Sequence, residues 1–536
     1  MSSHHARQGE DFASYSSSGQ MPLIMAMGES CFYPKRPSEV THRETHISHL
    51  FFADDLVYKV KKSVRFSFVD YSTLSKRRHF LHEELRWNQR LAPSVYLGVL
   101  PISHENDGWQ LGSDANPVEY TLVMRRLPEK RMLDFLLERN QVTLEMIRLL
   151  AETLAPFHAQ AQTGGKINAS GDPESIRKIW DDNLADIRPF VGRFLDAEEF
   201  RSLSDFGDSF ITKHKDLLAR RVEEGRIREL HGDLHCEHIC FAPEGIQIFD
   251  CVEFNPRLRC CDISSEVAFL VMDMEFRGAE KLARDFLTRY RELVDDHEMP
   301  LLLPFYKCYR AVVRGKVTAL QSDGKSPQAC RYFNYACRVR WETFKPFLVL
   351  ISGPTGSGKS TLARAMSQRL GVRAIGSDAT RKALAGVSDR QDTLSYEEGI
   401  YHPSMTQRTF AKMAEEAEKL ILRRDGVILD GTFHRKAQRE AVLNLAAKHR
   451  TPLAVIQCQS AEDVVRERLG KRAAEGRDLS DGRWEIYLKQ KTALEPFKEF
   501  SPSACLSLNT DADVSELCKK VEPFLQQLFL SEGVAN

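Results

Sequence analysis

Apolar and polar positions follow two different orders along the chain, and the change falls near residue 346. In the first part, short strand-like runs come before helices. Residues 56–60 and 120–124 are mainly apolar stretches of strand length, whereas residues 74–91 and most of 139–221 carry apolar positions at helical spacing. Strands followed by helices predict an α+β domain.

The second part alternates strands and helices. Residues 347–351 form an unbroken apolar run, a glycine-rich turn follows, and residues 359–370 have helical spacing. Repetition of this order predicts a parallel sheet with crossover helices. Pro346 favours a boundary at residues 344–347. We therefore expect a disordered tail at residues 1–30, a first domain at 31–345 and a second domain at 346–536.

Composition and charge are those of an ordinary globular protein. The 536 residues include 75 lysines and arginines against 75 acidic residues, which removes the general electrostatic case for a nucleic-acid coat or a polybasic membrane binder. The first twenty residues are Ser-rich and lack the apolar segment of a secretory signal, and the twelve cysteines follow no framework. No apolar run reaches 18 residues. These features predict a cytoplasmic protein without a membrane span.

A phosphate-binding motif opens the second part. Glycines let backbone N–H groups turn inward around phosphate oxygens, and the helix that follows adds its positive N-terminus. Lys359 is expected to reach the β- and γ-phosphates of ATP, and the Ser360 hydroxyl to ligate Mg²⁺. The expected ATP-binding residues of this loop are Gly353, Pro354, Thr355, Gly356, Ser357, Gly358, Lys359, Ser360 and Thr361.

Two carboxylates follow at strand ends. Asp378 ends a short strand and can orient or deprotonate an acceptor hydroxyl, with Arg381 to hold an acidic substrate. The alternative is that Ser377 or Asp378 caps the next helix. Asp430 ends an apolar strand and is expected to support Mg²⁺, with simple turn chemistry as the alternative.

An arginine-rich stretch lies further on. Such side chains can close over the transferring phosphate as a lid, although a solvated helix face is the other interpretation. Arg468 and Arg472 are the best candidates among four arginines, at positions 466, 468, 472 and 477.

Residues 347–510 resemble the small P-loop kinases, which include AAA-type, gluconate kinase-like, polynucleotide kinase-like and zeta-toxin-like members. The motifs GPTGSGKST, SDATRK and DGTF and the arginine-rich stretch carry this resemblance. It implies an α/β P-loop NTPase domain that uses ATP and Mg²⁺. It does not identify the acceptor.

The first part contains a second phosphotransfer pattern. The segment ELHGDLHCEHICF includes Asp233, and an apolar strand ends in Asp250 seventeen residues later. Asp233 can accept or orient the acceptor hydroxyl, while Asp250 holds Mg²⁺ on the ATP phosphates. Upstream, Lys59 lies where a strand-borne lysine would meet the α- and β-phosphates, and Glu84 can hold it. Lys61 and Glu83 are close alternatives.

This region resembles the aminoglycoside phosphotransferase and choline kinase branch of the protein-kinase-like fold. HGDLH, FDCVEF and FHAQA at 157–161 carry the likeness. The whole chain resembles bacterial fusions of such a domain with a P-loop kinase or ATPase. The expected fold is therefore multidomain, with an α+β bilobal protein-kinase-like domain followed by the α/β domain with a parallel sheet.

The first domain departs from the family pattern in two places. His238 stands where the family has a metal-binding Asn, and imidazole is a poor ligand for Mg²⁺. His238 then either replaces that Asn as a metal ligand or contacts phosphate, or else the domain uses a single metal ion or is a weak kinase. The stretch between the first strands contains no glycine, so Thr45, His46 and Ser48 either cap phosphates or form a plain turn.

Several histidines and cysteines lie within residues 231–240, and they suggest a zinc site as an alternative to the kinase interpretation. No second ligand pair stands nearby at zinc spacing, and zinc does not explain Asp250. The kinase interpretation accounts for both features.

These observations predict an ATP-dependent phosphotransferase with two nucleotide sites, which transfers the γ-phosphate to a hydroxyl of a small molecule. One alternative is a P-loop kinase or ATPase regulated by a degenerate kinase-like sensor domain. Another is a nucleic-acid 5′-hydroxyl kinase, which needs a basic groove with stacking aromatics. The balanced charge gives that last alternative no support.

Overall fold

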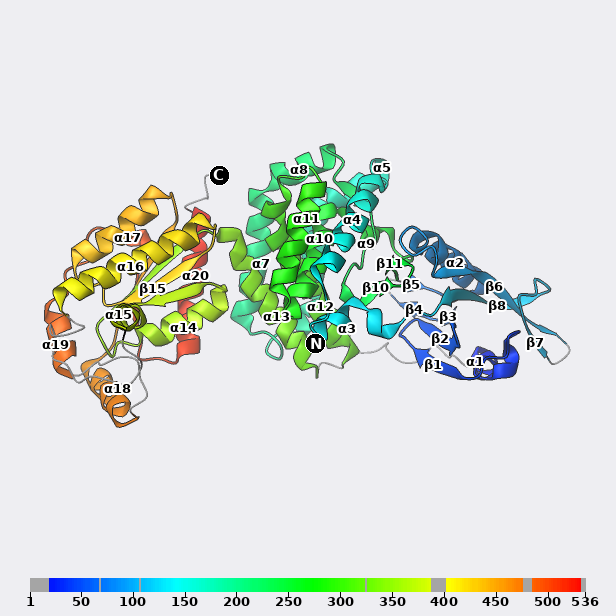
Figure 1. The fold of residues 1–536 in the computed structure, drawn as a ribbon, viewed down its shortest axis with the longest axis horizontal. Helices are drawn as coiled ribbons and strands as arrows, with labels where there is room; N and C mark the ends of the chain where they lie inside the picture. The colour runs from blue at the N-terminus through cyan, green and yellow to red at the C-terminus, as the bar shows by residue number, and fades with distance from the viewer. Residues whose placement is uncertain are drawn as a thin grey trace, which may run out of the picture. The chain divides into compact units, whose positions relative to one another are not determined.

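The computed structural model describes residues 19–66, 69–105, 108–322, 325–386, 402–475 and 484–531, without the side chains of 472–475 (Figure 1). Contacts divide the chain into two compact units, which are treated separately. The first comprises Met1–Asp182 and Ile211–Ala311, and the second Asn183–Phe210 and Val312–Asn536.

This division differs from the boundary expected at Pro346. The second unit also contains α13 (Pro327–Val339) and the 3-10 turn that follows it. Trp341 and Phe344 are buried in the same apolar cluster as Phe347. Proline interrupts local structure, but here the packed apolar surface continues across it.

An antiparallel sheet forms the start of the first unit. Its strand order is β1-β2-β3-β8-β6-β7. Alternation along β3 sends Tyr58 and Val60 into one core, while Lys59 and Lys61 reach Glu84 on the helix α2 (Leu74–Asn88). The strands are β1 (Val40–Glu44), β2 (Ser48–Ala53), β3 (Leu56–Lys61), β6 (Tyr96–Glu105), β7 (Gly108–Leu111) and β8 (Pro117–Arg125).

The expectation of a disordered tail over residues 1–30 is wrong for its last part. Residues Met21–Met27 form α1, whose Leu23 and Met27 are buried against Phe51 in the core of the sheet. The apolar spacing of this short segment suits one helical face, and burial of that face stabilises it. Residues 1–18 lie outside the described residues.

The rest of the first unit is mainly helical. Two antiparallel strand pairs, β9 with β12 and β10 with β11, carry the loops of the first candidate site. The strands are β4 (Arg65–Phe66), β5 (Val69–Asp70), β9 (Ile227–Glu229), β10 (Ile239–Ala242), β11 (Gly245–Ile248) and β12 (Cys260–Asp262). The helices are α3 (Leu133–Glu138), α4 (Leu144–Gln160), α5 (Gly165–Asn168), α8 (Lys215–Glu223), α9 (Pro256–Arg259), α10 (Ile263–Phe276) and α11 (Glu280–Leu293), with α6 (Pro173–Ile187), α7 (Ala197–Lys213) and α12 (Met299–Gln321) divided between the units.

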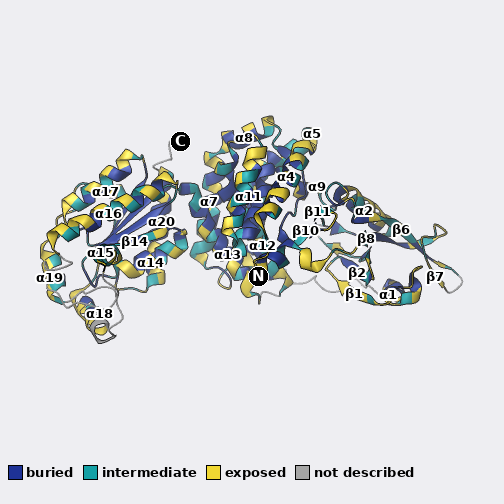
Figure 2. Ribbon diagram, viewed as in Figure 1, coloured by how far each residue is buried: buried dark blue, intermediate teal, exposed yellow. Residues whose placement is uncertain are grey.

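The second unit contains the predicted parallel sheet, in the order β14-β15-β13-β16-β17. Its strands are buried between helices that keep an exposed outer face (Figure 2). The strands are β13 (Leu348–Ser352), β14 (Arg373–Gly376), β15 (Val427–Gly431), β16 (Leu453–Gln459) and β17 (Cys505–Asn509). The helices are α14 (Lys359–Leu370), α15 (Ser377–Ala385), α16 (Pro403–Leu422), α17 (Lys436–Lys448), α18 (Glu462–Glu475), α19 (Trp484–Thr492) and α20 (Val514–Ser531).

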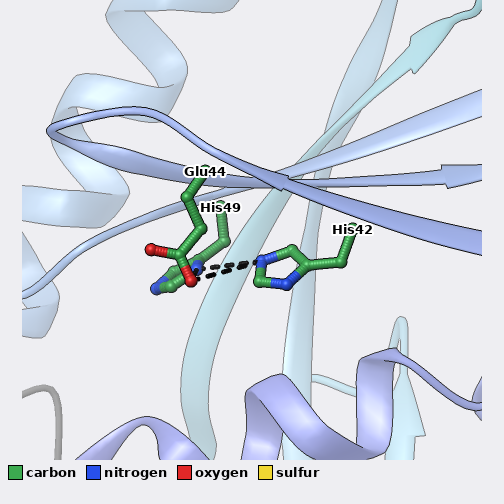
Figure 3. Close-up of side chains that lie close together, drawn as sticks. All are labelled: His42, Glu44 and His49. Carbon is green, nitrogen blue, oxygen red and sulfur yellow. Dashed lines mark hydrogen bonds and ion pairs between the residues drawn. The ribbon is translucent and has the colours of Figure 1, made fainter.

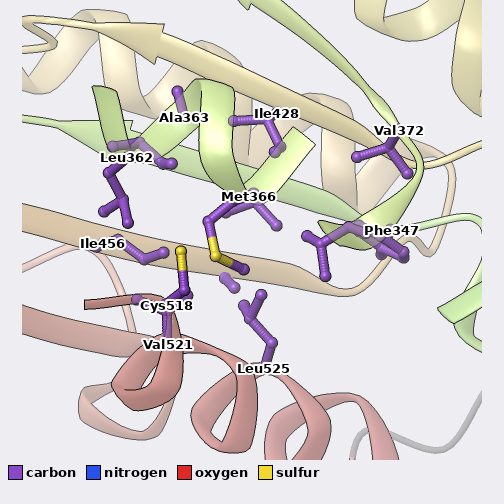
Figure 4. Packing of buried hydrophobic residues seen from close by; sticks show 14 of the residues in the cluster. Phe347, Leu362, Ala363, Met366, Val372, Ile428, Ile456, Cys518, Val521 and Leu525 are labelled. Carbon is purple, nitrogen blue, oxygen red and sulfur yellow. The ribbon is translucent and has the colours of Figure 1, made fainter. Parts of the chain in front are cut away.

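Apolar packing on both sides holds this sheet. On one face Met366 of α14 and Val521 of α20 meet side chains of the strands, among them Ile428 and Ile456 (Figure 4). On the other face α16 and α17 cover the sheet. The strand order reverses at β13, so the loop after β13 lies at the edge where such sheets bind ligands. Among the described helices, none is both long and apolar enough to cross a membrane.

Candidate active sites

The loop between β13 and α14 is shaped for close backbone approach. A Cβ atom on Gly353 would lie 2.6 Å from Ser357 Oγ and 2.8 Å from the carbonyl oxygen of Cys458. Gly356 and Gly358 both have φ of 78°, a left-handed conformation that other residues rarely adopt. All three glycines are therefore required by the geometry of the phosphate-binding loop.

A buried carboxylate lies beside this loop. Asp430 of β15 stands opposite Ile351 of β13 and forms a hydrogen bond with Ser360. Burial raises the pKa of Asp430, against the opposing effect of Lys359. Among the described residues its Oδ1 has no hydrogen-bond partner. An orphaned carboxylate oxygen next to a hydroxyl fits Mg²⁺, which prefers oxygen ligands.

Asp378 and Arg381 lie in the first turns of α15. Their side chains form an ion pair of 2.9 Å between Asp378 Oδ1 and Arg381 Nη1. The residue that caps α15 is Gly376, and no side chain caps the helix. The alternative that Ser377 or Asp378 serves as the cap is therefore not what the structure contains.

A cavity of about 770 Å³ adjoins the phosphate-binding loop. Its size is that of small-molecule pockets. Among the lining residues, three carry positive charge and one carries negative charge: Lys359, Arg381, Arg435 and Asp378.

Of the two expected lid arginines, the structure describes the side chain of Arg468 but not that of Arg472. Arg468 Nη2 donates to the carbonyl of Thr510 at 2.7 Å, and its Nη1 lies 3.4 Å from the place of a Cβ on Gly358. It therefore braces the loop rather than pointing into solvent. Arg472 lies in α18, but its side chain is outside the described residues, as is Arg477.

The predicted lysine–glutamate contact is present in the first unit. Lys59 Nζ lies 2.6 Å from Glu84 Oε1 and 3.3 Å from Asp250 Oδ1. Lys61 contacts the other oxygen of Glu84 at 2.7 Å, and it is itself buried and paired with Glu253. Glu83 instead accepts a hydrogen bond from Trp87. Glu84 thus joins both lysines, and Lys59 is the one that reaches Asp250.

Charge pairing outweighs burial at this cluster. Burial alone would raise the pKa of Glu84, but Lys59 and Lys61 together lower it. Partial burial likewise opposes ionisation of Asp250, yet the positive charge of Lys59 holds its pKa below the usual range. Both carboxyl groups are therefore ionised near neutral pH.

Asp250 has the backbone conformation of a constrained site residue. Its φ is 61°, its N–H donates to the hydroxyl of Tyr96 at 3.1 Å, and its side chain is 47% exposed. A non-glycine residue at positive φ persists only where its surroundings impose it, and such residues cluster at functional sites. The exposed side chain can meet a ligand.

The loop that carries Asp233 is held by its neighbours. Gly232 has φ of 87°, and a Cβ there would lie 2.8 Å from the carbonyl oxygen of Leu258. His231 Nε2 donates to the carbonyl of Phe249 at 2.9 Å, while its Nδ1 accepts from the N–H of Asp233 at 3.3 Å. Burial lowers the pKa of His231 to about 4, which agrees with one donor and one acceptor on a neutral ring.

His238 lies between the two acidic residues. Its Nδ1 is 2.9 Å from the carbonyl oxygen of Asp233, which can only accept, so Nδ1 carries the proton. Nε2 of the neutral ring then presents a lone pair to Asp250 Oδ2 at 3.6 Å. Both atoms carry lone pairs, and a cation placed between them could bind to both. Asp250 and His238 are therefore suited to hold a metal ion.

Sequence reasoning missed the carboxylate that positions this loop. Glu266 of α10 accepts the N–H groups of His231 at 3.1 Å and Gly232 at 2.7 Å. His158, from the FHAQA segment, contacts Glu266 at 3.3 Å. Asp273 lies about two turns further along the same face of α10, and it accepts the N–H of Cys236. Glu266 and Asp273, seven residues apart in a mostly apolar helix, were the available signal.

The side chain of Thr45 takes part in a local turn. Its Oγ1 accepts the N–H of Ser48 at 3.0 Å, which closes the turn between β1 and β2. For Thr45 the plain-turn interpretation holds.

Both parts of the chain match models of known protein families. The sequence model of the phosphotransferase enzyme family matches residues 52–302, and that of an AAA domain matches residues 348–497. The uncharacterized protein Rv2004c of Mycobacterium tuberculosis is 31% identical over 445 residues, which are 82% of this chain and 87% of that protein. A counterpart in Mycobacterium bovis has the same identity and coverage.

The chain therefore belongs to the family of these mycobacterial proteins, with a phosphotransferase enzyme family domain followed by an AAA domain of the P-loop kinase type. The protein is a kinase or phosphotransferase.

Two further similarities cover only a part of this chain. A 2-phosphoglycerate kinase of Pyrococcus horikoshii is 45% identical over 70 residues, which are 12% of this chain and 21% of that protein. The crystal structure of a gluconokinase from Sinorhizobium meliloti has a TM-score of 0.27 at 18% identity, covering 35% of this chain and 95% of that one.

Proposed function

We propose that the second unit transfers the γ-phosphate of ATP to a hydroxyl group of a small acidic acceptor. The observation that carries the proposal is the cavity beside the phosphate-binding loop, in which Lys359, Arg381 and Arg435 outnumber Asp378. Arginine forks bind carboxylate and phosphate groups, so an anionic acceptor suits this lining. The short similarity to a 2-phosphoglycerate kinase agrees with this class.

In this proposal the residues around the cavity hold ATP, the metal ion and the acceptor, and Lys359 and Arg381 each serve two purposes. The loop backbone and Lys359 hold the ATP phosphates, while Ser360 and Asp430 hold Mg²⁺, which neutralises charge on the phosphate oxygens. Asp378 accepts the proton of the attacking hydroxyl, and Arg381 keeps this carboxylate in place through its 2.9 Å ion pair. Arg468 supports the loop, and Arg472 remains a lid candidate.

For the first unit we propose a second ATP site. Lys59, held by Glu84, binds the α- and β-phosphates; Asp250 and His238 hold the metal ion; and Asp233 orients an acceptor hydroxyl. The Lys59–Glu84 contact of 2.6 Å and the exposed Asp250 support this assignment. The competing role is a nucleotide sensor, which would bind ATP at the same residues without transferring phosphate.

The experiment is transfer of labelled phosphate from ATP to a panel of acceptors. The panel contains hydroxy acids and phosphorylated hydroxy acids beside neutral sugars, aminoglycosides, nucleosides and oligonucleotides. We expect the acidic compounds to be labelled in wild type and in Asp233→Asn, but not in Asp378→Asn. Labelling of oligonucleotides alone would instead establish the 5′-hydroxyl kinase, and labelling of neutral acceptors alone would contradict an acidic one.

A further inference from the structure

A group of metal-ligating side chains lies outside both candidate active sites, on the hairpin formed by β1 and β2. His42 and Glu44 are two residues apart on β1, so they share one face of the strand. His49 on β2 is directly opposite Glu44 in the strand register. Figure 3 shows the three side chains turned toward one another on this face.

Their distances match the coordination shell of a metal ion. His42 Nε2 lies 3.1 Å from His49 Nδ1, His49 Nδ1 lies 3.6 Å from Glu44 Oε1, and His42 Nε2 lies 4.0 Å from the same oxygen. A tetrahedral ion with bonds of about 2.0–2.1 Å separates its ligand atoms by about 3.3 Å. The three atoms therefore need only small side-chain movements to bind one ion.

The surroundings hold these ligands in place. The His42 ring stacks on Phe51 with 4.6 Å between centroids and an interplanar angle of 9°. His49 is buried, with a side chain only 5% exposed, and burial lowers its pKa to about 4. Lys62 binds Glu44 Oε2 at 2.7 Å and leaves Oε1 to face the histidines.

We propose that His42, Glu44 and His49 bind a divalent transition-metal ion of the Zn²⁺ class. Two imidazoles and one carboxylate select such ions over Mg²⁺, which prefers oxygen ligands only. His42 and Glu44 are 30% and 54% exposed, so a water molecule has access to the fourth position. The ion ties β1 to β2, and β2 pairs with β3 so that Leu50 lies opposite Lys59. Metal binding thus stiffens the sheet that carries Lys59.

The test measures Zn²⁺ bound to the full-length protein, prepared without a polyhistidine tag, by equilibrium dialysis. His42→Ala and Glu44→Gln are the informative variants because both side chains are exposed enough to be changed without loss of folding. We expect each to weaken Zn²⁺ binding by at least about 10-fold, the loss caused even by removing the partner of a ligand. His46→Ala, an exposed histidine of the intervening turn, is the matched control and should bind like wild type.

Three further measurements show whether Zn²⁺ binds at His42, Glu44 and His49 or elsewhere in the protein. Zn²⁺ should raise the melting temperature of wild type but not of His42→Ala, because only a binding-competent native state is stabilised by mass action. Co²⁺ in place of Zn²⁺ should give a tetrahedral absorption spectrum that Glu44→Gln loses. Among the described residues, Asp233, His235 and His238 form another metal-ligating group, so His235→Ala is included. The proposal is overturned if wild type binds no Zn²⁺, if His42→Ala and Glu44→Gln bind normally, or if only His235→Ala loses binding.

Discussion

In the roles proposed for them, the two candidate centres hold ATP phosphates by opposite means. In the second unit one continuous stretch, residues 353–361, supplies the loop, the lysine and the hydroxyl. In the first unit the corresponding groups come from four separate segments, at Lys59, Glu84, Asp233 and Asp250. The loop of the second unit depends on the backbone conformations of its glycines. The centre of the first unit depends instead on buried, oppositely charged side chains that pair with one another. That centre is therefore more sensitive to loss of a single carboxylate.

The largest effect is expected from Glu84→Gln. Glu84 is fully buried and pairs with both Lys59 and Lys61. Removing one member of a buried ion cluster costs about 3–5 kcal/mol, so the first unit should melt at a clearly lower temperature. Calorimetry of wild type, Glu84→Gln and the control Glu83→Gln checks this. Equal melting of the two variants would contradict the central role of Glu84.

The same carboxylate predicts a pH dependence. The folded state lowers the pKa of Glu84 from its ordinary value of 4.5, so its contribution to stability is present above that pH. It is lost as the pH falls through the lowered value. Wild type should therefore lose stability on acidification more steeply than Glu84→Gln, in melting curves recorded from pH 6 downward.

Lys359→Ala should reduce phosphate transfer by the second unit about 10²- to 10³-fold, because one preorganised positive contact to the phosphates is lost. Folding should be unaffected, since the lysine is not part of the apolar core. Lys419→Ala, an exposed lysine of α16, is the matched control. Unchanged turnover in Lys359→Ala would remove the loop from the mechanism.

Asp233→Asn separates a working first centre from a sensor. The change keeps shape but removes the base, so transfer by the first unit should fall about 10²-fold or more while ATP affinity changes little. Asp250→Asn should weaken binding of Mg-ATP itself. Exposed Asp216→Asn serves as the control. A silent Asp233→Asn, together with an Asp250→Asn that alters turnover by the second unit, would establish the sensor.

The smallest effect is expected from His238→Asn. If His238 is a metal ligand, an oxygen donor at this position should increase activity with Mg²⁺ several-fold and decrease any preference for Mn²⁺. Metal titrations of transfer by the first unit measure the change. A raised KM for ATP, with metal preference unchanged, would make His238 a phosphate contact instead.

Prediction of the fold from sequence was confirmed where the pattern is local. Gly353, Lys359 and Asp430 could be placed in the fold because apolar runs mark β13 and β15 and helical spacing marks α14, whereas their roles stay predictions. Lys59 and Glu84 could be proposed only with Lys61 and Glu83 as alternatives. Lys59 and Lys61 lie on the same face of β3 and both contact Glu84, so only the contact of Lys59 with the distant Asp250 separates them.

The sequence by itself determined the two kinds of domain, the phosphate-binding loop and the spacing between Asp233 and Asp250. These features depend on periodicity and on residues close together in the chain. Only the tertiary structure decided that Glu84 joins two lysines, that Glu266 and His158 hold the loop of Asp233, and that His42, Glu44 and His49 converge. Packing across Pro346 was likewise invisible, because Trp341 and Phe347 share a core. Contacts between distant segments are chosen by which surfaces bury together, and no local pattern encodes that choice.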